Sequence, residues 1–238
     1  MNKIIPSPKE HVFFSSMAII LAAVIVCGFS NTYLPKLLNN PVIVPEIVHL
    51  HALIFSLWLA FFVFQVTLIL RKKYDLHRRL GSYGVLFSFA MGVVGCATAV
   101  EVAKLGHIGI PGVEFPDAEG FLLLNLTSLF SFVSLTVLGW LFRNNASMHK
   151  RFMLMANAGG LTPPAVARLP FIAGSTPAIA IVSLLLILAG PIYDLIRYRR
   201  IHWVYLCCIA IIILSLPPVV LALSGMNLWK EIASFLMR

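Results

Sequence analysis

Long apolar segments separated by short polar loops fill almost the whole chain, and they leave little room for any other kind of fold. A helix needs about 20 mostly apolar residues to cross the hydrocarbon core of a bilayer. Segments of about that length occupy residues 12–30, 47–70, 83–103, 120–142, 152–172, 178–196 and 203–223. The sequence therefore predicts an all-α polytopic membrane bundle of about seven transmembrane helices, with residues 1–238 as a single integral membrane domain.

Composition excludes a soluble domain of this size. Hydrophobic residues make up 60% of the 238 residues and charged residues only 11%, whereas charged residues are about one quarter of a typical soluble domain. The net charge of +9 would suggest nucleic acid in a soluble protein. Here the basic residues lie in short loops between apolar segments, which is typical of membrane topology, so we expect no nucleic acid partner.

Residues 152–172 form the least regular of the predicted spans, and residues 227–238 form a short tail of a different kind. The irregular span contains residues that disturb a membrane helix: Asn157, Gly159, Gly160, Pro163, Pro164 and Arg168. A second proline pair, Pro217-Pro218, interrupts the last span, and we expect kinks at both pairs. The tail alternates apolar and polar residues and predicts an amphipathic helix at the membrane surface.

Lysine and arginine are distributed unevenly between the two sets of loops. The loops on the opposite side from the amino terminus hold only Lys36, Lys104, Lys230 and Arg238. The amino-terminal side holds Lys3, Lys9, Arg71, Lys72, Lys73, Arg78, Arg79, Arg143, Lys150, Arg151, Arg197, Arg199 and Arg200. Because basic loops stay in the cytoplasm, this bias predicts a cytoplasmic amino terminus.

Three histidines share one position in a weak internal repeat. His77, His149 and His202 each follow a basic loop at the cytoplasmic start of a span, so we expect all three at one depth. His77 lies beside Arg78, and His149 lies two residues before Arg151. Imidazoles on facing helices ligate haem, and its propionates favour nearby basic side chains. Small residues that would let a flat macrocycle approach follow both histidines: Gly81, Gly84, Ala156, Gly159 and Gly160.

Two other interpretations of these histidines remain open. His77, His149 and His202 together offer three imidazoles, which would suit iron, copper or zinc. Alternatively, each histidine is a solvated residue at the membrane surface. Asp194 would orient His202 or His149 as a hydrogen-bond acceptor, or would pair with Arg197 instead.

A second group of histidines lies toward the opposite side of the membrane. His49 and His51 point about 200° apart on a regular helix, so only one of them can face the core. His107 follows in a loop on the same side, and the three histidines are candidate ligands of a second metal or haem. A packed stripe on the same helix is the alternative, formed by His51, Phe55, Trp58, Phe62 and Gln65. Arg168 is the one charge well inside an apolar segment, and such charges are usually functional. It lies near the outer end of that segment, so the alternative is that its side chain snorkels to the membrane surface.

The spacing of these histidines resembles the diheme transmembrane cytochromes of the b561 type. The resemblance covers about residues 47–170 and is carried by His51-Ala52, His77-Arg78-Arg79-Leu80-Gly81 and His149-Lys150-Arg151-Phe152-Met153. A group of poorly characterised bacterial multi-span proteins has a similar signature, and some of them look like cytochrome oxidase assembly factors. The resemblance implies an inner haem held by His77 and His149, an outer haem with His51 or His49 as one ligand, and a bacterial inner membrane. The segment Gly120–Asn125 contains no histidine that could complete the outer haem.

The sequence therefore leads to a membrane-bound b-type haem redox protein that transfers electrons, with a quinone or a redox protein as partner. One alternative is a non-haem metal-binding membrane enzyme or oxidase-assembly and metal-delivery factor that uses copper, zinc or iron. Another is a small-molecule transporter whose broken helices act as gates. Homo-oligomers are compatible with all three hypotheses.

Overall fold

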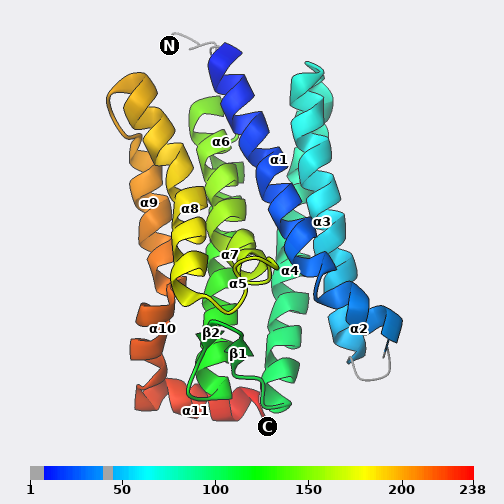
Figure 1. Cartoon of the computed structure of the whole chain (residues 1–238). Helices are drawn as coiled ribbons and strands as arrows, with labels where there is room; N and C mark the ends of the chain where they lie inside the picture. Colours follow the sequence, from blue (N-terminus) through cyan, green and yellow to red (C-terminus); the bar gives the residue numbers. More distant parts are fainter. Residues whose placement is uncertain (1–7, 40–44) are drawn as a thin grey trace.

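The computed structural model describes residues 8–39 and 45–238, which form an all-α bundle of long, nearly parallel and antiparallel helices (Figure 1). The helices before the only β-hairpin among the described residues are α1 (Pro8–Ser30), α2 (Tyr33–Asn39), α3 (Glu46–Leu70) and α4 (Tyr74–Lys104). The helices after it are α5 (Ala118–Leu141), α6 (Ala146–Met155), the π-helix η2 (Ala156–Leu161), α7 (Thr162–Val166), α8 (Thr176–Tyr198), α9 (Trp203–Ile212), the 3-10 helix η3 (Ile213–Ser215), α10 (Pro217–Ser224) and α11 (Asn227–Leu236).

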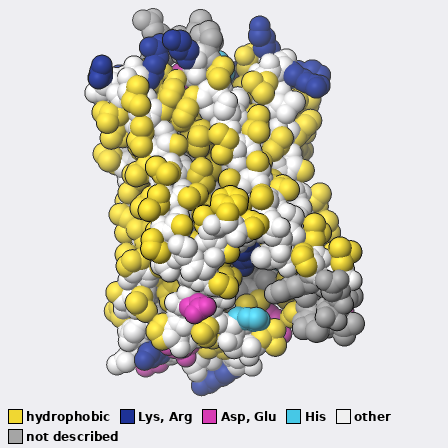
Figure 2. Space-filling view, viewed as in Figure 1, with side chains coloured by type: hydrophobic (Ala, Val, Ile, Leu, Met, Phe, Trp, Pro, Cys, Tyr) yellow, Lys and Arg dark blue, Asp and Glu magenta, His cyan; other side chains and the backbone are white. Residues whose placement is uncertain are grey.

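Among the described residues, five helices are long and apolar enough to cross a membrane: Lys9–Pro35, Glu46–Leu70, Tyr74–Lys104, Ala118–Leu141 and Thr176–Tyr198. The pair formed by Trp203–Ser215 and Pro217–Ser224, bent by 50°, makes a sixth if it counts as one span. Apolar side chains cover the body of the bundle, and Lys and Arg gather mainly at one end (Figure 2). The protein is thus an α-helical integral membrane protein.

The basic end of the bundle is defined by three loops, at residues 71–73, 142–145 and 199–202. The hairpins α3–α4 and α4–α5 pack along their lengths, and α6 packs between α5 and α9. Helix α1 crosses the front of the bundle and packs on α7 (Figure 1). A Cβ on Gly28 would lie 2.2 Å from the carbonyl oxygen of Ala165, so glycine is what permits this close crossing.

The predicted span 152–172 has other bounds in the structure, and the irregularity expected within it takes the form of a π-helix. Its helical part begins earlier, at Ala146, widens into η2, and ends at Val166. Pro163 and Pro164 lack the N–H groups that a regular helix would need at those positions, and the π-helix changes the hydrogen-bond register just before them. The hydroxyl of Thr162 donates to the carbonyl of Asn157 at 2.8 Å, so the widened turn has its own hydrogen bond.

The predicted kink at the second proline pair is confirmed. Pro217 and Pro218 occupy the first positions of α10, where proline is tolerated because the first helical N–H groups have no partner within the helix. The chain bends by 50° at this break. Leu216, before the prolines, has an extended backbone, as expected for a residue that precedes proline.

Helix α4 begins nine residues before the predicted span, and this extension determines where one histidine lies. The first turn starts at Tyr74 and includes His77. The helix therefore continues beyond the apolar segment into the basic end, since hydrogen bonds within the helix satisfy its backbone there as well as they do in lipid.

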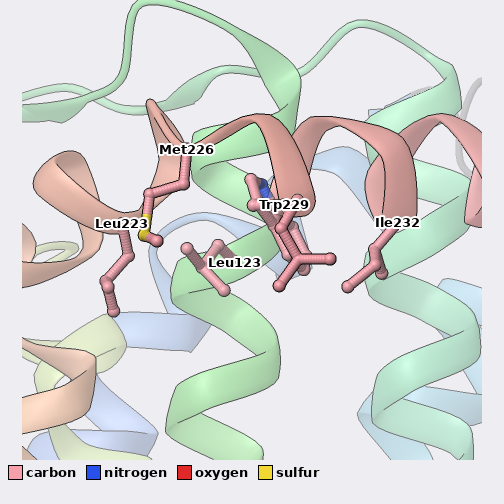
Figure 3. Close-up of a pocket in the computed structure, with 6 residues that line it drawn as sticks. Leu123, Leu223, Met226, Trp229 and Ile232 are labelled. Atoms are coloured by element: carbon pink, nitrogen blue, oxygen red, sulfur yellow. The ribbon is translucent and has the colours of Figure 1, made fainter.

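The end opposite the basic end is closed by a short hairpin and by α11. The strands β1 (Gly109–Ile110) and β2 (Val113–Glu114) pair antiparallel in a loop that the sequence did not predict to be ordered. Helix α11 is confirmed as a helix and lies across this end (Figure 1). The indole N–H of Trp229 donates to the carbonyl of Glu119 at 3.1 Å. Figure 3 shows Trp229 with Leu123, Leu223 and Met226 around an apolar hollow between α5, α10 and α11.

The core of the bundle is aromatic at its centre. Trp58 contacts Phe87 and Phe132 edge to face, with ring centroids 5.8 and 5.0 Å apart. Its indole N–H donates to the side-chain oxygen of Asn157 at 3.1 Å. The stripe predicted on this helix is therefore its packed face, because Trp58, Phe62 and Gln65 are all buried.

Candidate functional site

Two histidine rings face each other at the basic end. His77 lies in the first turn of α4 and His149 in the first turn of α6. Their ring centroids are 6.0 Å apart and the ring planes are inclined by 76°. The side chain of Asn145 accepts hydrogen bonds from the backbone N–H groups of Ser147 and Met148, and this cap fixes where α6 begins. The first turns of α4 and α6, which are far apart in the sequence, thus place two imidazole rings side by side.

The ring of His149 is oriented by the backbone of α5. Its Nδ1 lies 2.7 Å from the carbonyl oxygen of Gly139. Because a carbonyl only accepts, the ring donates from Nδ1 and keeps the lone pair of Nε2 for another partner. A backbone carbonyl that holds one ring nitrogen is the usual support of a metal-ligating histidine. A Cβ on Gly139 would lie 2.8 Å from Sδ of Met153, so glycine here lets α5 and α6 approach.

Several buried polar atoms near this end lack partners among the described residues. Nδ1 of His77 is buried and makes no hydrogen bond. Both amide atoms of Gln65, Oγ1 of Thr136 and Nε1 of Trp140 are also buried without a partner. Each such group costs about 1–3 kcal/mol when left unpaired. Clusters of this kind are where an additional ligand or ordered water is expected.

The imidazole pair has the donor set for a metal, and its spacing allows one ion to be shared. A metal–imidazole bond is about 2 Å long, so rings whose centroids are 6.0 Å apart can approach the same ion from two sides. Two neutral imidazoles on facing helices are also the axial ligand set of a b-type haem.

The glycines expected to admit a flat macrocycle have another role. A Cβ on Gly84 would lie 3.0 Å from Phe61, one on Gly159 would lie 2.3 Å from Ile212, and one on Gly160 would lie 2.7 Å from Phe132. Neighbouring side chains already fill the space beside these glycines. The sequence interpretation of these three positions was therefore wrong, because close helix packing accounts for the small residues.

Arg151 was expected to bind a cofactor propionate, but it is held in a buried ion pair. Its Nε and Nη2 donate to the two carboxylate oxygens of Asp194 at 2.9 and 2.7 Å. Its Nη1 donates to the carbonyl and the hydroxyl of Ser147, both at 2.8 Å. Glu10 on α1 pairs with Lys150 and lies 3.7 Å from Arg151. The guanidinium is thus already paired by protein groups.

This network also corrects the role of Asp194. The carboxylate pairs with Arg151 and not with Arg197, and none of the described hydrogen bonds links it to His202 or His149. Of the basic residues beside the imidazole pair, Arg78 and Arg79 are exposed and uncommitted to any ion pair among the described residues. The part played by Glu10 could not be predicted from the sequence, because nothing in its segment shows which helix packs beside α1.

His202 does not join the other two histidines. It forms the N-cap of α9, where its Nδ1 accepts from the backbone N–H of Val204 at 3.3 Å, and its ring stacks on Trp203. Burial, together with the positive charge of nearby Arg151, lowers the pKa of His202. Across residues 8–39 and 45–238, no group of three or more His, Cys, Asp or Glu side chains could hold a metal ion. The three-histidine site is therefore not formed.

The histidines near the opposite end are also separate. Nδ1 of His49 lies 2.6 Å from the hydroxyl of Tyr33. His51 stacks on Phe55, with ring centroids 3.9 Å apart, and His107 is exposed in its loop. The described part of the chain thus assembles no second metal site from these three histidines.

Comparison with known proteins gives no further information. No protein-family model, no curated protein and no solved structure matches the chain.

Proposed function

We propose that this chain is a membrane redox protein that binds one b-type haem between His77 and His149. The observation that carries the proposal is the pair itself: the rings face each other from α4 and α6 at 6.0 Å, and the Gly139 carbonyl leaves Nε2 of His149 free to ligate. Haem would supply one-electron chemistry. The protein supplies two axial ligands and a buried setting.

The proposed topology has seven passes with the amino terminus in the cytoplasm. The segment from Ala146 to Val166, formed by α6, η2 and α7, would be the fifth pass, and the bent α9–α10 pair would be the seventh. The concentration of Lys and Arg at the basic end (Figure 2) supports this orientation. The haem would then lie near the cytoplasmic face of a bacterial inner membrane.

Arg78 and Arg79 are the proposed partners of the haem propionates, in place of Arg151. They lie directly after His77 and are exposed. Guanidinium groups bind carboxylates in a two-pronged geometry. Electrons would exchange with a quinone in the membrane or with a soluble redox protein at the same face, because the described residues form one facing imidazole pair, which lies at that face.

The test is an absorption spectrum of the detergent-purified protein, first oxidised and then reduced with dithionite. A Soret band that shifts on reduction, with sharp α and β bands, is the signature of low-spin haem with two histidine ligands. A featureless visible spectrum from cells with an adequate haem supply would reject the proposal.

A single non-haem metal ion is the second candidate, and the packing around the pair favours it. Phe61 already fills the space beside Gly84, which lies about two turns from His77 in α4. A bare ion needs no such space, and imidazole suits copper, zinc and iron. Elemental analysis that finds about one metal ion per chain, without a Soret band, would select this candidate over haem.

A further inference from the structure

Arg168 lies at the other end of the molecule from the imidazole pair, two residues after the end of α7. Its Nη1 donates to the carbonyl of Pro164 at 2.7 Å. Its guanidinium carbon lies 4.9 Å from the ring centroid of Phe29 on α1. A guanidinium has five N–H donors, and the described contacts use one of them. The remaining donors have no described protein acceptor.

No Asp or Glu among the described residues forms a salt bridge with Arg168. All acidic residues of the chain lie within the described ranges, so the missing partner is not hidden elsewhere in the sequence. A charge removed from water is costly unless it is paired, and charges inside membrane segments usually mark a pathway or a binding site. Arg168 is therefore a cation for which the described residues supply no anionic partner.

His51 provides a second, independent observation at the same place. Nδ1 of His51 is buried without a hydrogen-bond partner among the described residues. Its ring stacks on Phe55. Trp58, two turns along the same face of α3 from His51, donates to Asn157 in η2, so α3 lies beside the segment that leads to Arg168. Nδ1 of His51, which has no described partner, and the spare donors of Arg168 thus lie toward the same end of two neighbouring segments.

The surface of the molecule is hollowed in this region. Figure 2 shows a basic side chain set back in a hollow over the region where Figure 1 places the end of α7, well away from the basic end. Hydrophobic side chains lie above the hollow on this face, and an acidic side chain and a histidine lie below it (Figure 2). Arg168 contacts the ring of Phe29, and His51 contacts the ring of Phe55.

We propose that Arg168 and His51 bind an oxyanion, a phosphate or carboxylate group that enters this hollow. The planar guanidinium matches the oxygens of both groups in a two-pronged geometry, and the imidazole adds a donor from its ring N–H. The oxyanion belongs either to the head group of a membrane lipid or to a small soluble molecule. The site is separate from the proposed haem and does not depend on it.

The test is thermal unfolding of the purified, delipidated full-length protein, because a bound ligand raises the unfolding temperature by mass action. The probes are phosphatidylglycerol in micelles, phosphatidylcholine as the uncharged lipid control, inorganic phosphate and acetate. The variants are Arg168→Gln and, as a matched control, Lys104→Gln, which removes an exposed charge near the same end. We expect at least one anionic probe to stabilise the wild-type protein and K104Q.

In R168Q the same probe should bind at least tenfold more weakly, because a charge-assisted pair of hydrogen bonds is lost. Stabilisation by phosphatidylglycerol alone assigns the oxyanion to a lipid, whereas stabilisation by phosphate or acetate assigns it to a soluble molecule. If R168Q cannot be purified, Arg168→Lys and His51→Gln take its place, each with several-fold weaker binding. A wild-type protein that responds to none of the anionic probes, or an R168Q that responds as strongly as K104Q, would overturn the proposal.

Discussion

Arg151 and Arg168 are both arginines in a largely apolar bundle, and they differ in what surrounds them. Arg151 donates to both carboxylate oxygens of Asp194 and twice to Ser147. Arg168 donates once, to the carbonyl of Pro164, and covers the ring of Phe29. The first guanidinium is part of the structure that joins three helices, whereas the second still has donors for a ligand. The arginine next to the candidate haem histidines is thus the structural one.

The largest expected effect comes from breaking the satisfied pair. Asp194→Asn leaves the buried Arg151 with only the more distant Glu10, 3.7 Å away, as a counter-charge, and the side chains of Arg151 and Asp194 are at most 3% exposed. The free energy of unfolding should fall by about 3–5 kcal/mol. Chemical unfolding in mixed micelles measures this loss of free energy. Arg168→Gln is the comparison, and in the absence of anions it should change the free energy of unfolding far less.

A control distinguishes a structural pair from a functional one. Replacing both partners with apolar residues, as in Arg151→Met with Asp194→Leu, should restore most of the lost stability, since well-packed apolar residues often replace a buried ion pair at little cost. If D194N unfolds with the wild-type free energy, the pair has no structural role and the comparison fails.

The second effect tests the packing of the π-helix. A Cβ at position 160 would lie 2.7 Å from Cβ of Phe132 and 2.9 Å from its Cα, and backbone cannot move away as a flexible side chain can. Gly160→Ala should therefore destabilise the protein by up to about 3 kcal/mol. Gly225→Ala is the matched control, because its new Cβ would meet nothing closer than 3.7 Å. Equal unfolding midpoints for the two variants would disprove the tight packing of η2.

A smaller effect is expected at the centre of the bundle. Trp58→Phe removes the indole N–H that donates to Asn157 and leaves a buried amide oxygen unpaired. The cost should be about 1–2 kcal/mol. Trp229→Phe, which affects a donor nearer the surface at α11, should cost less. If Trp229→Phe lowered the unfolding midpoint more than Trp58→Phe, the Trp58–Asn157 hydrogen bond would not contribute the expected stability.

The smallest effect on stability is expected at His51, although this residue belongs to a proposed site. His51→Phe retains the stacking surface against Phe55 and loses no described hydrogen bond, so the unfolding midpoint should change by less than the equivalent of about 0.5 kcal/mol. A loss as large as that of W58F would mean that His51 is already paired within the protein, and that the contrast between the two regions is wrong.

The sequence predicted those features that depend on local patterns. The α3 stripe, the bend at Pro217-Pro218 and the terminal helix α11 all follow from spacing along one segment, and the structure has each of them. The early start of α4 could not be predicted from hydropathy, because a helix may extend into water as long as its backbone is satisfied.

Long-range partners could not be predicted in the same way. Asp194 is separated from Arg151 by 43 residues, and nothing in either segment shows that α8 packs beside α6. The sequence placed His77 and His149 at one depth, but the distance between their rings depends on which helices are neighbours. His202 also follows a basic loop, but it caps α9 and does not face the other two histidines. This difference too depends on which helices are neighbours.

The most direct test of the proposed redox centre is the haem content of four purified proteins: wild type, His77→Ala, His149→Ala and His202→Ala. We expect about one haem per chain in the wild type and in H202A, and little or none in H77A and H149A. His202 is the matched control because it lies after a basic loop like the other two but caps α9 instead of facing the pair. Haem that is absent from the wild type, or present in equal amounts in all four proteins, would contradict the assignment of His77 and His149 as its ligands.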